Sequence, residues 1–327
     1  MSVLRVGVAL VMGAMLLAVA AAKARQDRPR DGRPSEIRIT SDGVAAAKAR
    51  QDGPKKVALL EPAFGLTAAP ELITTRIGQI KLKRVPAGEF MMSSNSSASG
   101  YDAEFLDNAA SEAGKKKHRV RITRPFYLGV YEVTQAQYEA VMGNNPSFFT
   151  ANGRGNDRVP GQSTDRHPVE QVGWLDAVKF CNKLSEREGI APYYEIDGGK
   201  VTVADWNRPG YRLPTEAEWQ YACRANTSTR YPFGDDAARL GEYGWFSGNS
   251  GNKTHPVGEK RPNGFGLYDM LGNVSERCWD AHDEPSHMYS GHVYCGGDLA
   301  ARSVCRDAAD CPAGTIGFRL ALSQSVR

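Results

Sequence analysis

From about residue 72 onward, the pattern of apolar and polar positions predicts many short strands. Ile80–Val85 alternates loosely between the two classes and runs into Pro86-Ala87-Gly88, which is typical of a strand that enters a turn. Further apolar runs predict strands at Val120–Ile122 and Phe126–Val130, and a hairpin that joins Tyr193–Ile196 to Val201–Val203 through Asp197-Gly198-Gly199.

Three helices are predicted by capping signals and helical periodicity. Thr134–Gln137 forms a capping box, and the helix that it opens ends at Gly143. The second helix begins at Trp174 and ends at Gly189. Trp174, Val178 and Cys181 are spaced i, i+4 and i+7, which places them on one face of this helix. The third opens at a capping box, Thr215–Glu218, and runs through Trp219 to Cys223. After Arg224 we expect only loops and short strands, so the pattern indicates a loop-rich α+β fold.

The first 22 residues have the character of an export signal. Arg5 precedes the apolar run Val6–Val19, and Ala20, Ala21 and Ala22 follow it, as at a signal-peptide cleavage site. The alternative is a retained membrane anchor, because the 17 residues Val6–Ala22 are at the short limit for a span. We expect cleavage and a periplasmic or secreted protein with no stable transmembrane span.

Residues 23–71 are predicted to be a disordered basic linker. Ala, Arg, Gln, Asp, Pro and Gly dominate this stretch, and its first aromatic residue is Phe64. The sequence VAAAKARQD occurs twice, at 19–27 and at 44–52. Two local copies indicate a duplicated linker rather than a repeat fold.

The charge is concentrated in this N-terminal part. Residues 1–56 hold 11 Lys and Arg against 5 Asp and Glu, although the whole chain has a net charge of only +4. The remaining residues are therefore slightly acidic, which argues against nucleic-acid binding. Phosphate-loop, dinucleotide and nucleophile-elbow motifs do not occur in the sequence.

Seven motifs in one order carry a family resemblance. They are Pro86–Phe90, Glu132–Thr134, His167–Val169, Arg212–Trp219, Asn263–Asp269, Gly272–Val274 and Gly317–Arg319. Over roughly residues 76–322 the chain resembles the formylglycine-generating enzyme, or sulfatase-modifying factor, family. The resemblance implies one calcium-stabilised domain, at 72–323, with a fold related to C-type lectins. It also implies a type activity, the copper- and oxygen-dependent oxidation of a cysteine to formylglycine in an extended sulfatase peptide.

The segment that carries the family's copper-binding cysteine pair departs from the pattern. The family's Arg-Gly-Gly-Ser turn is here Cys295-Gly296-Gly297-Asp298, and Cys305 follows Gly297 by only eight positions. The family's Trp-Glu-Trp is Ser275-Glu276-Arg277. We therefore predict a divergent, monomeric member that binds an extended peptide or small ligand in the family groove, near Ser275, Arg277 and Asp298.

Two other functions remain open. The first is a metal- and oxygen-dependent oxidoreductase of the formylglycine-generating type, whose catalytic candidates are Cys295, Cys305 and Cys311. The second is a binding scaffold in which residues 295–316 are a variable surface.

The six cysteines have different expected roles. The resemblance implies a disulfide between Cys223 and Cys305, and export makes it plausible. Cys181 lies on an apolar helix face, which favours a buried free thiol. Cys278, Cys295 and Cys311 could include a second disulfide, whose pairing the sequence leaves open.

Two metal sites are considered. The resemblance implies a calcium site in which Asp269 and Glu276 supply side-chain oxygens and Gly272 and Val274 supply carbonyl oxygens. His282, His287 and His292 suggest zinc or copper, but their spacing matches no standard site. A polar surface loop is the simpler interpretation of these histidines.

Overall fold

The computed structural model describes residues 69–93, 117–281, 292–297 and 315–323, all of which belong to one compact unit, Leu66–Arg327. The predicted signal peptide, nearly all of the linker, and the candidates Asp298, Cys305, Cys311, His282 and His287 lie outside the described residues. Among the described helices, none has the length and apolar character that crossing a membrane requires.

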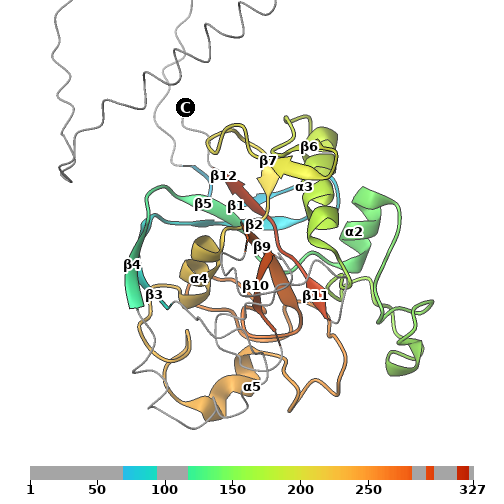
Figure 1. Ribbon diagram of the computed structural model, residues 1–327. Helices are drawn as coiled ribbons and strands as arrows, with labels where there is room; N and C mark the ends of the chain where they lie inside the picture. Colours follow the sequence, from blue (N-terminus) through green and yellow to red (C-terminus); the bar gives the residue numbers. More distant parts are fainter. Residues whose placement is uncertain (1–68, 94–116, 282–291, 298–314, 324–327) are drawn as a thin grey trace, which may run out of the picture. The chain divides into compact units, whose positions relative to one another are not determined.

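A five-stranded antiparallel sheet joins the two ends of the domain (Figure 1). The last strand, β12, lies between β5 and β8, and the register places Leu322 opposite Tyr127. The strands, in sheet order, are β1 (Leu72–Thr74), β2 (Lys81–Val85), β5 (Phe126–Gly129), β12 (Ala321–Ser323) and β8 (Tyr211–Arg212). The predicted strands at 80–85 and 126–130 are thus confirmed to within one residue.

Three smaller sheets complete the β structure. One has β9 (Ser275–Ala281) at its centre, with β10 (His292–Gly296) antiparallel and β11 (Ile316–Gly317) parallel to it. The other two are hairpins, β3–β4 (Gly88–Ser93 and Lys117–Ile122) and β6–β7 (Glu195–Asp197 and Lys200–Thr202). The hairpin predicted around Gly198-Gly199 is therefore confirmed.

The helices also follow the prediction closely. They are α2 (Gln135–Met142), α3 (Trp174–Glu188) and α4 (Glu216–Arg224), and both predicted capping boxes form. The expectation of no helix after Arg224 is wrong, because α5 (Leu240–Tyr243) follows a 3₁₀ turn at Ala237–Arg239, and another such turn lies at Asn156–Arg158. Four residues make about one turn, which is too short to show helical periodicity.

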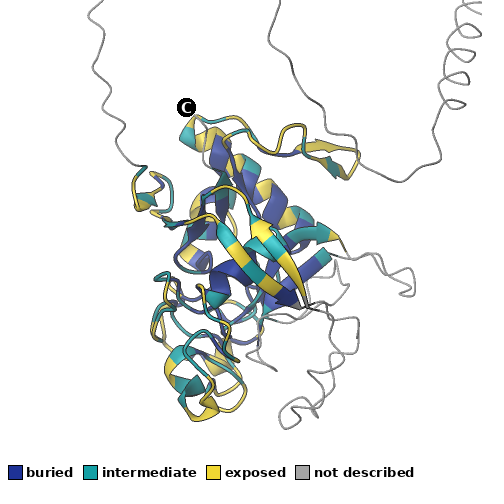
Figure 2. Ribbon diagram, turned by 90° about the vertical axis from the view of Figure 1, so that its left-hand side faces the viewer, coloured by how far each residue is buried: buried dark blue, intermediate teal, exposed yellow. Residues whose placement is uncertain are grey.

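Two apolar clusters hold these elements together. Phe180 and Leu184 of α3 pack in the first cluster, with α2 and the central sheet. Trp219 of α4 packs in the second, with Cys278 of β9 and Cys295 of β10. Figure 2 shows buried residues in the interior and exposed residues on the outer turns and hairpins. The second cluster is the one that underlies the candidate site, because β9 carries Ser275, Glu276 and Arg277 and β10 carries Cys295.

Candidate functional site

A fully buried ion pair lies at the centre of the site. The side chains of Glu276 in β9 and Arg319, which precedes β12, are both 0% exposed. Arg319 donates from Nε and Nη2 to the two carboxylate oxygens of Glu276, at 2.5 Å each, and from Nη1 to the carbonyl of Gly129 at 2.9 Å. Trp219 donates from Nε1 to Glu276 Oε2 at 2.7 Å. These hydrogen bonds compensate two charges that have no access to water.

Asp269, which the resemblance places in the calcium loop, lies beside this pair. It is 2% exposed and has a left-handed backbone (φ 57°). Its Oδ2 accepts from the Gly258 N–H at 2.7 Å, whereas its Oδ1 is buried and has no hydrogen-bond partner among the described residues. Burial raises the pKa of Asp269 to about 6, although the Gly258 N–H and the charge of Arg319 oppose the shift.

Glu132 is a third buried acid at this place, and the sequence analysis did not identify it as a site residue. One carboxylate oxygen accepts from the Val274 N–H at 3.1 Å and the other from Asn273 Nδ2 at 2.9 Å. Burial raises its pKa well above the ordinary value, and the charges of Asp269 and Glu276 add to this effect. An acid inside the apolar run from Phe126 to Val133 was the available signal.

The residues of the predicted calcium loop fit a hard cation in part. Three buried carboxylates face a single guanidinium, and Asp269 Oδ1 is an oxygen without a partner. Both Glu276 oxygens, in contrast, already accept from Arg319. In the described part of the chain, no group of three or more His, Cys, Asp or Glu side chains could hold a metal. The carbonyl oxygens of Gly272 and Val274 would therefore have to complete the ligand set.

The backbone at Gly272 is specific to glycine. Its φ of +139° is rare for other residues, and a Cβ at this position would lie 1.9 Å from the carbonyl oxygen of Trp245. The predicted calcium loop therefore packs directly against the segment that follows α5.

The described cysteines are all buried. Cys223 in α4 lies with its Sγ 3.7 Å from the Met270 carbonyl oxygen, and its predicted partner Cys305 is outside the described residues, so that disulfide stays a prediction. Cys181 is a free thiol in the first cluster, as expected. Cys295 lies next to Cys278, with 3.6 Å between the two sulfurs, and in the structure both are free thiols. The third oxidase candidate, Cys311, is not described, so the candidate set is not tested as a whole.

The groove candidates have different environments. Ser275 is the first residue of β9 and is half-buried. It lies against Gly297, which comes directly after β10. Arg277 is 0% exposed, donates from Nε to the Val172 carbonyl at 3.3 Å, and has its guanidinium 6.0 Å from the ring centre of Tyr294. Arg277 therefore lies in the interior rather than on an open groove wall, because β9 turns this side chain towards the loop that precedes α3.

Five aromatic side chains gather beside β9 and β10, and we call them the aromatic shelf. They are Trp174, Tyr194, Trp206, Trp279 and His292. His292 stacks on Trp174 with 3.5 Å between ring centres, Trp279 stacks on Tyr194 at 4.9 Å, and Trp206 meets Trp279 edge-on at 5.8 Å. The stacking gives His292 a packing role that the metal hypothesis did not anticipate.

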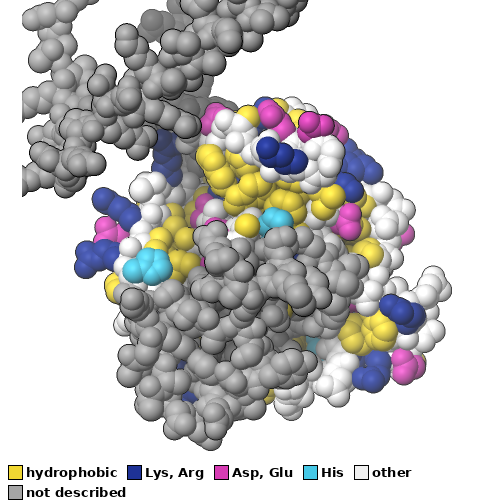
Figure 3. Space-filling model, viewed as in Figure 1, with side chains coloured by type: hydrophobic (Ala, Val, Ile, Leu, Met, Phe, Trp, Pro, Cys, Tyr) yellow, Lys and Arg dark blue, Asp and Glu magenta, His cyan; other side chains and the backbone are white. Residues whose placement is uncertain are grey.

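The outer edge of the shelf is open to solvent. Trp206 is 50% exposed, and Ile196 of β6 is 40% exposed. Figure 3 shows hydrophobic side chains gathered on this face, below the β6–β7 hairpin. Sequence reasoning missed the shelf because its members come from α3, two loops, β9 and β10, and no single stretch contains the pattern.

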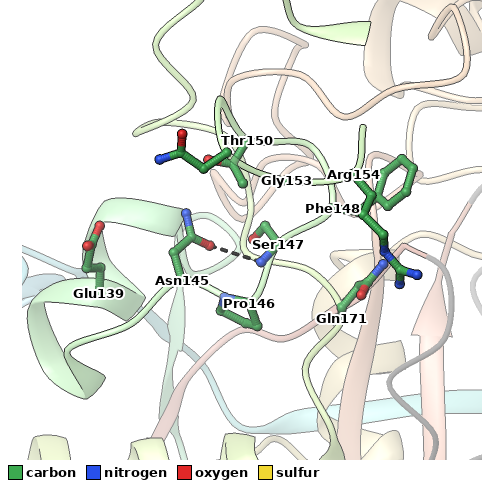
Figure 4. A pocket seen from close by; sticks show the side chains of 10 residues that line it. Glu139, Asn145, Pro146, Ser147, Phe148, Thr150, Gly153, Arg154 and Gln171 are labelled. Atoms are coloured by element: carbon green, nitrogen blue, oxygen red, sulfur yellow. Dashed lines mark hydrogen bonds between the residues drawn. The ribbon is translucent and has the colours of Figure 1, made fainter. Parts of the chain in front are cut away.

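A separate cavity of about 460 Å³ lies in the loop after α2 (Figure 4). Its lining includes Glu139, Asn145, Phe148, Arg154 and Gln171, and it shares no lining residue with the shelf or the calcium loop. Glu139 lies on one side, and Phe148 and Arg154 lie on the other. Sequence reasoning did not identify this cavity.

Beneath this loop lies Glu170, which is 0% exposed. Its Oε1 accepts from the Phe149 N–H at 2.9 Å, and its backbone N–H donates to Ser147 Oγ at 3.2 Å. Burial raises the pKa of Glu170 to about 7, although backbone N–H groups of the loop oppose the shift. Glu170 therefore stabilises the loop that lines the cavity, through hydrogen bonds to two of its residues.

Known proteins resemble this chain over most of the described domain. Residues 78–324 match the sulfatase-modifying factor enzyme 1-like domain. The chain is 36% identical over 191 residues to the chaperone protein LppX of Paenibacillus barcinonensis, covering 49% of this chain and 64% of that protein. It is 25% identical over 304 residues to the mouse formylglycine-generating enzyme, covering 79% of this chain and 78% of the enzyme.

Among solved structures, the Treponema denticola variable protein 1 matches with a TM-score of 0.64 and 29% identity, over 78% of this chain and all of that one. PvdO from Pseudomonas aeruginosa matches with a TM-score of 0.55 at 24% identity, which concerns the fold alone. The family match, the motif order and the loop-rich α+β architecture agree, and the chain therefore belongs to the sulfatase-modifying factor enzyme 1-like family.

Proposed function

We propose that this protein is an exported binding member of its family, which holds an extended peptide or small ligand against β9, β10 and the aromatic shelf. The observation that carries the proposal is Trp206, an indole that is half exposed while its ring contacts Trp279. An aromatic surface that is already held in place can stack on a ligand at a low cost in conformational entropy.

The cysteines support binding over oxidation. A copper(I) oxidase needs thiolates that the metal and the substrate can reach, because copper in this state prefers sulfur ligands. Cys295 is 0% exposed and occupies the position of the family's arginine, and burial raises the pKa of its thiol. A neutral, enclosed thiol at this position is a poor ligand for catalytic copper.

The alternative is an oxidoreductase that converts a protein cysteine to formylglycine, and relatives such as the mouse enzyme favour it. Oxygen consumption separates the two functions. The full chain would be incubated with copper(I) and a Cys-x-Pro-x-Arg peptide, with the Ser-x-Pro-x-Arg peptide as a control that has no thiol. A second control holds copper(I) and the cysteine peptide without the protein, because copper alone catalyses the oxidation of thiols by oxygen. We expect the protein to add no oxygen uptake to this control, and protein-dependent uptake with the cysteine peptide would establish the oxidase.

A variable-loop scaffold is favoured by one observation, the structural match to the Treponema variable protein. In that case residues 295–316 would differ among gene copies that are otherwise identical. Sequencing of such copies tests the idea directly, and substitutions spread evenly over the domain would reject it.

The binding proposal is tested with a displayed library of random linear peptides, selected on the full chain. The enriched peptides would be titrated against wild type, Trp206→Ala and the control Met91→Ala, since Met91 of β3 is 48% exposed and outside the shelf. We expect at least tenfold weaker binding for Trp206→Ala and no change for Met91→Ala. Equal affinity for all three proteins would remove the shelf from the binding site.

We also propose that the loop from Asp269 to Glu276 holds Ca²⁺. Asp269 would bind through Oδ1, Gly272 and Val274 through their carbonyls, and Glu276 through a carboxylate that Arg319 keeps in place. When bound, the ion would supply positive charge to three buried acids. We expect a chelator to lower the melting temperature of the wild type and of Asp165→Asn, an exposed control. It should have little effect on Asp269→Asn, and an equal effect on all three proteins would reject the site.

A further inference from the structure

Cys278 and Cys295 lie on neighbouring antiparallel strands and face the same side of their sheet. The register pairs Cys295 with Glu276 and Tyr294 with Arg277. Because side chains alternate along a strand, Cys278 has the same orientation as Glu276, and the two cysteines are diagonal neighbours across the strand pair. Their sulfurs are 3.6 Å apart. A small movement would bring them to the bond length of a disulfide, about 2.05 Å.

The surroundings of the pair are closed. Both cysteines are 0% exposed and pack with Trp219 and Val293 in the second apolar cluster. The acids Glu216, Glu276 and Asp280 are also near enough to disfavour a thiolate. Exchange requires an outside thiolate to reach one of the sulfurs and a cysteine thiolate to leave, and burial opposes both steps, so exchange is slow in the folded domain. A bond made before the strands close would afterwards be protected from reductants.

We propose that Cys278 and Cys295 form a structural disulfide that joins β9 to β10. The two thiols lose two protons and two electrons as the S–S bond forms. A low-molecular-weight disulfide such as oxidised glutathione accepts them by thiol–disulfide exchange, and its S–S bond is converted to two thiols. The bond forms during folding, while both thiols are still accessible.

The bond has a defined place in the candidate site. The β9–β10 register shifts between His292 and Tyr294, so the hydrogen-bond ladder of this strand pair is interrupted there. A link between 278 and 295 secures the strands next to the shift. It thereby holds Ser275 and Gly296, which are paired in the register, at the edge of the proposed ligand surface.

Peptide mapping of the full chain tests the pairing. The chain would be folded with reduced and oxidised glutathione, denatured, alkylated, and digested with trypsin without reduction. Cys278 and Cys295 fall in one tryptic peptide, 278–302, because no Lys or Arg lies between them, whereas Cys305 and Cys311 fall in two others.

The expected result is peptide 278–302 without alkyl groups and two hydrogen masses lighter than its reduced form. Cleavage at Asp280 and Asp283 then leaves two fragments joined by the disulfide. Alkylation of both cysteines, or a link from either one to Cys223, Cys305 or Cys311, would overturn the proposal.

Variants provide a second measurement that does not depend on mapping. Reduction should lower the melting temperature of the wild type, and Cys278→Ala, Cys295→Ala and the double variant should all lose the same part of this shift. Cys181→Ala, a buried free thiol of the other cluster, should retain the full shift. A full shift in the double variant would show that the two residues are not bonded.

Discussion

Removal of the charge from Glu276 should be among the most destabilising single changes in this domain. Glu276→Gln keeps the size of the side chain but leaves the fully buried Arg319 without the carboxylate that accepts two of its hydrogen bonds. Loss of one partner of a buried pair typically costs about 3–5 kcal/mol. Glu132 and Asp269 also attract Arg319, so we expect the lower end, about 3 kcal/mol.

Removal of the positive charge, in Arg319→Met, should destabilise the domain more than Glu276→Gln does, and the loss of stability should depend on pH. Arg319→Met leaves three buried carboxylates without a cation, and we expect a loss of about 5 kcal/mol near neutral pH. Glu132 and Asp269 then have folded pKa values raised further above their unfolded values, because the charge of Arg319 no longer opposes the shift, so the folded state favours their neutral form. Stability is therefore lost as pH rises, and Arg319→Met should recover part of the difference from wild type as the pH falls from 7 to 5.

Urea denaturation, measured with and without a calcium chelator, gives the free energy of unfolding of Glu276→Gln and of Arg319→Met relative to the wild type. A loss of about 3 kcal/mol moves the midpoint by roughly 1–3 M, since urea slopes for small proteins are about 1–3 kcal/mol per M. Glu89→Gln is the matched control, because Glu89 pairs with Arg119 and Arg121 at 3.5 and 3.4 Å on an exposed hairpin. Exposed pairs contribute at most about 1 kcal/mol.

A double variant completes the test. If Glu276→Gln in the Arg319→Met background costs much less than in the wild type, the two residues act as one unit. The reasoning is refuted if Glu276→Gln costs no more than Glu89→Gln, or if its cost is the same in both backgrounds.

Three further changes have defined outcomes. Glu170→Gln should flatten the pH dependence of stability. The folded pKa of Glu170, about 7, lies above the ordinary 4.5, so the wild type loses roughly 3 kcal/mol of stability as pH rises through this interval. Urea midpoints of both proteins at pH 5 and 7.5 check this, and an equal shift of the midpoint in both would contradict it. Gly272→Ala should destabilise the domain by several kcal/mol, because the new Cβ would clash with the Trp245 carbonyl oxygen. The Cβ of Gly161→Ala would lie in open space, so this control should cost only about 1–2 kcal/mol of backbone strain. Equal melting temperatures for the two variants would argue against the clash. Thr215→Ala removes the side chain that accepts from the N–H three residues on and should cost about 1 kcal/mol by thermal denaturation, while Thr215→Ser should restore most of it.

Local features of the fold could be predicted from the sequence because their stabilising contacts are local. The capping boxes at Thr134 and Thr215 each use a residue three positions away, and both form as expected. The ends of α2 and α3 are also determined locally, because each helix stops at a single glycine with a left-handed backbone, Gly143 or Gly189. The short helix α5 was missed because its four residues carry neither a capping side chain nor a repeating apolar face.

The candidate site was predictable only where a motif pointed to it. Asp269 and Glu276 were named through the family resemblance, but their contacts were not. Glu132 and Val274 are 142 positions apart, and no periodicity links them. The proximity of Cys278 to Cys295 and the position of His292 in the aromatic shelf likewise depend on the pairing of β9 with β10.

By itself, the sequence determined the family, the α+β class, the boundaries of the three longer helices and the separation of a basic N-terminal segment from an acidic body. These properties follow from composition, short-range hydrogen bonds and ordered motifs. Only the tertiary structure decided that Arg277 is interior, that Cys295 faces Cys278, and that three acids share one arginine. The reason is physical, because burial sets the energy of a charge or a thiol, and burial depends on residues that are distant in the chain.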